Sequence, residues 1–85
     1  MLKSWHDSAW EDYLWWQRQD PKTLKRINRL IRDIERHGLQ TTGKPEPLHG
    51  DLNGWWSVRI DDVNRLVFAI RHDTLEIYAC KGHYE

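Results

Sequence analysis

The sequence contains few of the residues that crosslink or stiffen a chain. Its 85 residues include one cysteine and three prolines. A single cysteine excludes an intrachain disulfide and suits a reducing cytosol, so we expect a cytoplasmic protein. No apolar run approaches the roughly 20 residues of a membrane span, and the first residues lack the apolar segment of a signal peptide. We therefore expect a single domain, residues 1–85, without a membrane partner.

An excess of charge is also missing. Lys and Arg number 13 and Asp and Glu number 13, which makes the formal net charge zero. The chain as a whole therefore does not attract nucleic acid, and any phosphate binding must come from local clusters of basic residues. Tryptophan, by contrast, is abundant, with six residues. A chain this small buries only about 60–65% of its unfolded surface, so these rings should fill the core or lie in an interface.

Two helices are expected in the first half of the chain. Leu2–Trp5 is a candidate strand, and Asp7–Gln19 has the acidic start and broad apolar side of a helix. Trp15 falls off that side, which packing at the helix edge and contact with a partner explain equally well. Asp20 followed by proline predicts a second helix, Pro21–His37, which ends before Gly38.

The second helix has an apolar face and a basic face. Leucines and isoleucines cover about 120° of the helix, and six cations lie on the opposite side. These six residues are Lys22, Lys25, Arg26, Arg29, Arg32 and Arg36. Such a face is either simply solvated or a patch that binds RNA, DNA or an acidic partner.

Strict alternation over residues 55–70 predicts a β-hairpin that turns at Asp61-Asp62. This register places Arg59 opposite Arg65 on one face. Adjacent arginines repel each other, so a shared anion such as a phosphate would explain the pair. Ordinary ion pairs with neighbouring acids are the alternative.

A third strand is expected at residues 75–80, after a two-residue loop at His72-Asp73. If this strand pairs with the second strand of the hairpin without a bulge, core residues of the two strands lie opposite one another, and Arg65 lies beside the chain end. The expected pairs are Ile70–Leu75, Phe68–Ile77, Val67–Tyr78, Leu66–Ala79 and Arg65–Cys80.

Residues 39–54 are expected to form a connecting loop, in which Glu46 stands between two prolines that stiffen the backbone. The arginine face of the sheet would gather Arg59, Arg65, Lys81 and His83, with Glu46 arriving on the loop. These groups suffice for metal-free RNA cleavage, in which a carboxylate deprotonates the ribose 2′-OH and an imidazolium protonates the leaving 5′-oxygen. Arginines would stabilise the charge of the transition state.

Metal and thiol chemistry are the competing interpretations. Cys80 and His83 have a plausible ligand spacing, but zinc needs four ligands and the other histidines are scattered. Cys80 lies in an apolar strand with no base in its sequence context, so we expect a packed side chain. We therefore expect no metal and no cofactor.

Five segments carry a resemblance to a known family. In order they are WxxxxWEDYLWWQ, KPEPL, WWSVRI, RLVFAI and the terminal CKGHY. Together they resemble the YoeB toxins of the RelE/ParE superfamily of bacterial toxin–antitoxin systems. The resemblance implies an α+β fold of the microbial ribonuclease type, with two N-terminal helices packed on a small antiparallel sheet. It also implies an endonuclease that cuts mRNA in the ribosomal A site, a YefM-like antitoxin, frequent homodimers, and DNA contact only through the antitoxin complex.

The resemblance also assigns roles to residues. It implies that Glu46 is the general base, that Arg65 stabilises the phosphate, that His83 is the general acid and that Tyr84 positions the RNA. Arg59 would contribute to phosphate binding, and His49 and Lys81 are further candidates for RNA contact. Family members often carry lysine where this chain has His49, which implies weaker or pH-dependent phosphate attraction there. Glu85 adds an acid beside the site, which would mildly repel RNA.

We therefore interpret the chain as a ribosome-dependent mRNA interferase whose basic helix face grips ribosomal RNA. The alternative is a non-catalytic binding toxin of the same superfamily, such as a gyrase inhibitor, or a co-repressor that works only with its antitoxin. Glu46 and His83 discriminate between the two, because a binding protein does not need an acid–base pair.

Overall fold

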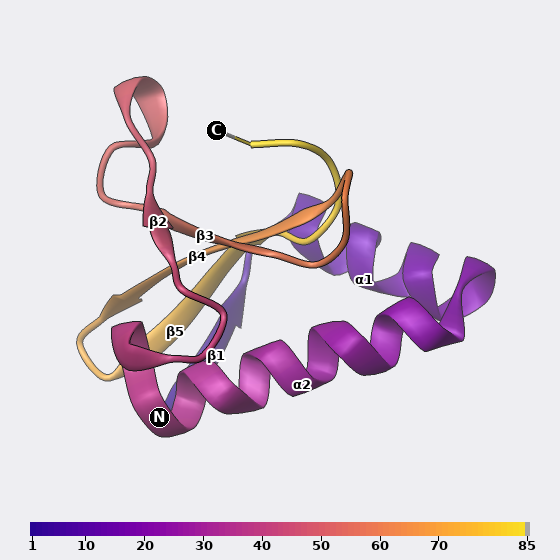
Figure 1. Ribbon diagram of the computed structural model, residues 1–85, viewed down its shortest axis with the longest axis horizontal. Coiled ribbons are helices and arrows are strands. Elements are labelled where there is room, and N and C mark those ends of the chain that lie inside the picture. The colour runs from indigo at the N-terminus through magenta and orange to yellow at the C-terminus, as the bar shows by residue number, and fades with distance from the viewer. Residues whose placement is uncertain (85) are drawn as a thin grey trace.

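The computed structural model describes residues 1–84, so Glu85 lies outside the described residues. Two helices cover one face of a five-stranded sheet, and the chain end curves back on the other side (Figure 1). The elements are β1 (Leu2–Trp5), α1 (Asp7–Gln19), α2 (Pro21–His37), β2 (Glu46–Pro47), β3 (Trp56–Arg59), β4 (Arg65–Arg71) and β5 (Thr74–Ala79). No helix in this part of the chain is long and apolar enough to span a membrane.

The expected α+β fold with two helices on a small sheet is confirmed. The strand order is β1-β5-β4-β3-β2. The pairs β2–β3, β3–β4 and β4–β5 are antiparallel, as expected, but β1 runs parallel to β5, so the sheet is mixed. Both helices lie between these two strands in the sequence, which gives the long connection that parallel neighbours need.

Local signals explain the position of α2. The Asp20 carboxylate accepts a hydrogen bond from the Thr23 N–H at 3.2 Å, and proline occupies the start of the helix. The N–H of Gly38 closes the helix on the Ile34 carbonyl, with a φ of 58° that glycine adopts without strain. Ile27, Ile31 and Ile34 are buried against the sheet.

The β3–β4 register matches the prediction, with Arg59 opposite Arg65. Along β4 and β5, Ile70 pairs with Leu75 and Phe68 with Ile77, also as expected, after a two-residue turn. A bulge beside Phe68 then pairs Val67 with Ala79. The expected pairs Val67–Tyr78, Leu66–Ala79 and Arg65–Cys80 are therefore wrong. An extra residue in one strand breaks the period of two, and simple alternation cannot detect it.

The loop expected over residues 39–54 contains a short strand. Glu46 pairs with Ser57 and Pro47 with Trp56, at the edge of the sheet. An edge position tolerates proline because the missing N–H faces away from the ladder. The prediction of a loop was wrong at these two residues, and Glu46 is held by strand pairing as well as by its flanking prolines.

The sheet buries side chains on both faces. One face packs Val58, Leu66, Phe68 and Ile77 against the helices. On the other face Leu48, Val67 and Ala79 form a smaller buried cluster, with Tyr84 packed against it. This second cluster supports the polar residues described next.

Candidate active site

Arg65 is the centre of the polar group on the face away from the helices. Its Nη2 lies 3.2 Å from Oε1 of Glu46, and its Nε donates to Oγ of Ser57 at 2.9 Å. The Arg65 side chain is 15% exposed and that of Glu46 is 73% exposed. The guanidinium is therefore held in place by two partners, while the carboxylate remains open to a substrate.

A hollow of about 500 Å³ lies over this pair. Its lining includes four of the candidate residues, namely Glu46, His49, Arg65 and Tyr84, and also Ser57. Strand order explains the convergence, because β2 pairs with β3 and β3 pairs with β4. The hollow thus holds a carboxylate, a guanidinium, an imidazole and a phenol around one space.

The segment after β5 is hydrogen-bonded to the residues at the start of β4. The Arg65 N–H donates to the Gly82 carbonyl, and the Gly82 N–H donates to Oδ1 of Asn64, both at 2.9 Å. Gly82 has a φ of 105°, which a residue with a Cβ rarely adopts. This bend carries the chain to Tyr84, whose ring contacts Tyr78 edge-on. Partial burial raises the pKa of Tyr84, and the nearby Asp12 carboxylate and Tyr78 add to the effect.

Asn64 is itself held by Asp61. Nδ2 of Asn64 donates to both carboxylate oxygens, at 3.2 and 3.1 Å, while Oδ1 of Asp61 accepts the N–H groups of Val63 and Asn64. Partial burial, the largest single influence, would raise the pKa of Asp61, but the hydrogen bonds together lower it. The β3–β4 turn and the chain end are therefore joined through one amide side chain.

Helix α1 anchors the same segment from the other side of the sheet. The carboxylate of Asp12 accepts the Cys80 N–H at 3.2 Å, and Nε1 of Trp16 donates to the Cys80 carbonyl at 2.8 Å. Burial raises the pKa of Asp12, and its effect exceeds the lowering by the Cys80 N–H and by Lys81. These bonds hold the end of β5 on the helix.

Three candidate residues lie outside the lining of the hollow. Arg59 is exposed and pairs with Asp62 at 3.7 Å. Lys81 places its Nζ 4.7 Å from the ring centroid of Trp15, which also contacts Trp16 edge-on. His83 is exposed. The gathering of all five groups expected from the sequence is therefore only partly present, since Glu46 and Arg65 meet while these three side chains do not line the hollow.

Cys80 is buried, and burial raises the pKa of its thiol to about 12, with the Asp12 carboxylate adding to the effect. The side chain is thus packed, as expected, and its thiol is protonated at neutral pH. Within residues 1–84, no group of three or more His, Cys, Asp or Glu side chains is arranged to hold a metal ion.

The basic face of α2 is present as expected. All six of its cations are exposed. None of them forms an ion pair within the described residues. This face is therefore a local positive patch on a chain of zero net charge.

Sequence reasoning missed the polar residues that support the site. The alternation over residues 55–70 puts Ser57 on the same face as Arg59 and Arg65, but nothing local marks it as a partner of Arg65. Asn64 and Asp12 act on a segment 18 and 68 residues away along the chain. Only the folded topology reveals those contacts.

Comparison with known proteins identifies relatives along almost the whole chain. Residues 5–84 match the family of YoeB-like toxins of bacterial type II toxin–antitoxin systems. The toxin YoeB of Escherichia coli K12 is 48% identical over 80 residues, which are 94% of this chain and 95% of the relative.

Solved structures of similar proteins cover the fold equally well. A YoeB/ParE toxin from Agrobacterium tumefaciens superposes with a TM-score of 0.93 at 42% identity, covering 99% of this chain and 100% of the other. A YoeB–YefM complex from Staphylococcus aureus gives 0.89 at 38% identity, and a YoeB dimer from the same organism gives 0.90 at 39%. These two cover 99% of this chain and 99% and 98% of theirs.

Proposed function

We propose that this chain, which belongs to the YoeB-like toxin family of bacterial type II toxin–antitoxin systems, is an endoribonuclease that cuts mRNA on the ribosome. The observation that carries the proposal is the arrangement around Arg65. A carboxylate that can act as a general base and a guanidinium that can bind phosphate lie side by side in an open hollow, which a toxin that acts only by binding does not need.

The reaction begins at Glu46. Its exposed carboxylate takes the proton of a ribose 2′-OH, and the 2′-oxygen attacks the adjacent phosphorus. The bond from phosphorus to the 5′-oxygen breaks, leaving a 2′,3′-cyclic phosphate on one fragment. His83 donates the proton that the leaving 5′-oxygen needs, so the fragments are released with a 5′-OH. No water and no metal enters this first step.

Arg65 stabilises the charge that develops on the phosphoryl oxygens. Ser57 occupies its Nε, so the terminal nitrogens remain directed toward Glu46 and the space above it. A scissile phosphate in the hollow would share that guanidinium with Glu46. Such preset donors are most effective where charge grows in the transition state. Tyr84, on the wall of the same hollow, positions the nucleotide.

The remaining candidate residues bind RNA around the hollow. His49 lines it, and Arg59 and Lys81 are exposed cations outside its lining that could contact the RNA on either side of the cleaved bond. The basic face of α2, with its six exposed cations, is proposed to bind ribosomal RNA.

The partners follow from the relatives. A YefM-like antitoxin is proposed to bind and neutralise this toxin, as the complex of the S. aureus relative suggests, and homodimers are proposed from the dimer of that relative. DNA would be reached only through the antitoxin complex, and the site of action is the cytoplasm, where ribosomes translate.

The test uses purified protein and ribosomes programmed with end-labelled mRNA. Cleavage within the A-site codon, with a 2′,3′-cyclic phosphate on the upstream fragment, is the expected result. Free mRNA and a 2′-deoxy substitution at the cleaved nucleotide serve as controls, and the deoxy message should stay intact. Ribosome binding without cleavage, or inhibition of DNA gyrase in a supercoiling assay, would assign the protein to the binding toxins instead.

A further inference from the structure

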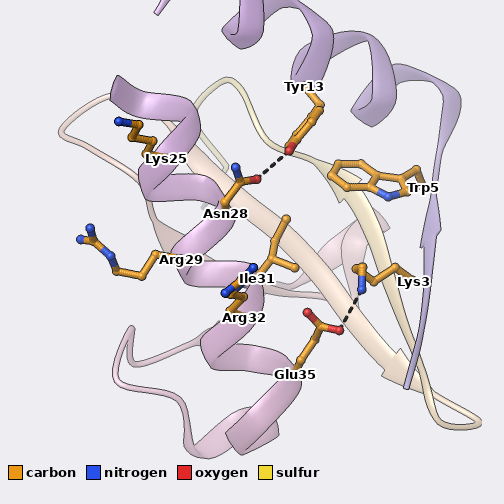
Figure 2. Close-up of a pocket in the computed structure, with 9 residues that line it drawn as sticks. All are labelled: Lys3, Trp5, Tyr13, Lys25, Asn28, Arg29, Ile31, Arg32 and Glu35. Atoms are coloured by element: carbon orange, nitrogen blue, oxygen red, sulfur yellow. Dashed lines mark hydrogen bonds and ion pairs between the residues drawn. The ribbon is translucent and has the colours of Figure 1, made fainter. Parts of the chain in front are cut away.

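A second and larger hollow lies away from the reaction site, where β1, α1 and α2 meet. Its volume is about 630 Å³. None of the residues proposed for RNA cleavage lines it. Figure 2 shows Tyr13 reaching from α1 toward Asn28 of α2, and Lys3 reaching from β1 toward Glu35 of the same helix.

One side of this groove is an ordered aromatic wall. The rings of Trp5 and Tyr13 meet edge to face with centroids 4.9 Å apart. The Tyr13 hydroxyl donates to Oδ1 of Asn28 at 2.6 Å. This bond fixes the side-chain amide of Asn28, so its Nδ2 points away from the Tyr13 hydroxyl. Asn28 lines the groove and is exposed, so its side-chain amide is open to a ligand there. The wall therefore offers an angled pair of apolar ring surfaces beside an oriented hydrogen-bond donor.

The other side of the groove is basic. Lys25, Arg29 and Arg32 line it, and none of the three has an acidic partner within residues 1–84. The one acid of the lining, Glu35, is already paired with Lys3 at 2.8 Å. The same three cations belong to the basic face of α2, so the groove opens onto the surface proposed to bind the ribosome.

We infer that this groove receives one unstacked nucleotide of ribosomal RNA when the toxin binds the ribosome, an inference that rests on the proposed function. The base lies against Trp5 and Tyr13, and its edge accepts a hydrogen bond from Nδ2 of Asn28. The flanking phosphates lie near Arg29 and Arg32. Aromatic faces combined with cations are the elements with which proteins hold unpaired nucleotides.

Two other occupants fit less well. A peptide strand added to the open edge of β1 would meet the Lys3–Glu35 pair, and a lysine on an edge strand disfavours such pairing. A second copy docked through the same surface across a two-fold axis would set one basic groove against another. An RNA backbone instead brings the charge that the groove lacks.

The experiment compares Asn28→Asp with Gln17→Glu in the intact chain. The first keeps the acceptor for Tyr13 but replaces the donor with a negative oxygen, whereas the second makes the same charge change at an exposed position of α1 outside the groove. Affinity for 70S ribosomes is measured by pelleting, and base-specific chemical probing of the ribosomal RNA reports each nucleotide. We expect the unsubstituted chain and Gln17→Glu to protect one unpaired nucleotide of the ribosomal RNA. Asn28→Asp should leave that nucleotide reactive and should bind 70S ribosomes at least tenfold more weakly than the unsubstituted chain.

The outcomes separate this inference from the proposed function. If the chain binds and cleaves but Asn28→Asp retains both the affinity and the protection, the groove inference alone is overturned. Weakened self-association or weakened binding of a YefM-like antitoxin by Asn28→Asp, with ribosome binding intact, would likewise overturn it in favour of a protein occupant. Binding and protection without cleavage would support the groove and contradict the nuclease. A chain that does not bind ribosomes would contradict both.

Discussion

Glu46 and Arg65 form an ion pair of 3.2 Å that spans β3, with the carboxylate on β2 and the guanidinium on β4. The proposed base and the proposed phosphate-binding cation are thus brought together before any RNA is present. The pair is asymmetric, because the arginine is largely enclosed and the glutamate is exposed. Preset geometry of this kind lowers the cost of reorganisation during the reaction.

Arg65→Lys should reduce cleavage strongly although it keeps the charge. Lysine lacks the planar guanidinium with which Arg65 donates to Ser57 and Glu46 at the same time, so the cation would no longer be held in a fixed direction. The single-turnover cleavage rate on programmed ribosomes should fall on the order of 100-fold or more, as for other preset donors. The matched control is Arg71→Lys, which alters an exposed arginine of the same strand paired with Glu76. A rate equal to that of the control would remove Arg65 from the mechanism.

Asn64→Ala should impair cleavage through the chain end. The change removes the side-chain oxygen that accepts the N–H of Gly82, a residue two positions before Tyr84. It also removes the side-chain amide that donates to the Asp61 carboxylate. We expect a rate loss of about tenfold or more with ribosome affinity unchanged, since small displacements of reacting groups are costly. Asn53→Ala, at an exposed turn, is the control for a lost asparagine side chain. Equal effects on binding and rate would indicate general unfolding instead of positioning.

The thiol of Cys80 should be almost inert in the folded protein. Raising its pKa from 9.0 to about 12 lowers the thiolate fraction at pH 8 on the order of 1,000-fold, and burial further limits access. Reaction with Ellman's reagent should therefore be slow in buffer and fast in guanidinium chloride. Rapid modification under native conditions would mean that the end of β5 opens readily.

Asp12→Asn should change the pH dependence of stability in a defined direction. The pKa of Asp12 in the folded protein is raised above its ordinary value of 3.8. Between the ordinary and the raised pKa, the native state therefore binds more protons than the unfolded state. The free energy of unfolding therefore falls as the pH rises through that interval. Asparagine keeps an acceptor for the Cys80 N–H and has no charge to bury. The stability of the variant relative to the parent should increase with pH and then level off, as measured by urea unfolding at several pH values.

The sequence predicts some elements of this fold better than others, for local reasons. Helix α2 is predictable because Asp20, Pro21 and Gly38 mark its ends, and the Arg59–Arg65 register follows from a short turn. The strand at Glu46 could not be predicted, because the prolines on either side of it are typical of a loop. The bulge beside Phe68 and the parallel pairing of β1 depend on packing that no local pattern records.

The candidate site shows the same division. The types of residue in it were predicted, since a carboxylate between prolines and paired arginines are visible in the sequence. Their meeting depends on β2 joining the edge of β3, which only the folded sheet shows. Ser57 and Asn64 were missed because each acts through another residue.

The most direct test of the proposed mechanism is the single-turnover cleavage rate of Glu46→Gln on programmed ribosomes. The matched control is Glu76→Gln, which alters the glutamate of the other Glu–Arg pair on the sheet. Glutamine keeps the size of the side chain and cannot take the 2′-OH proton. The rate should fall by about 100-fold or more for Glu46→Gln, as expected for loss of a general base, with A-site binding retained and the control unchanged. Cleavage by Glu46→Gln at the rate of the control would contradict the account.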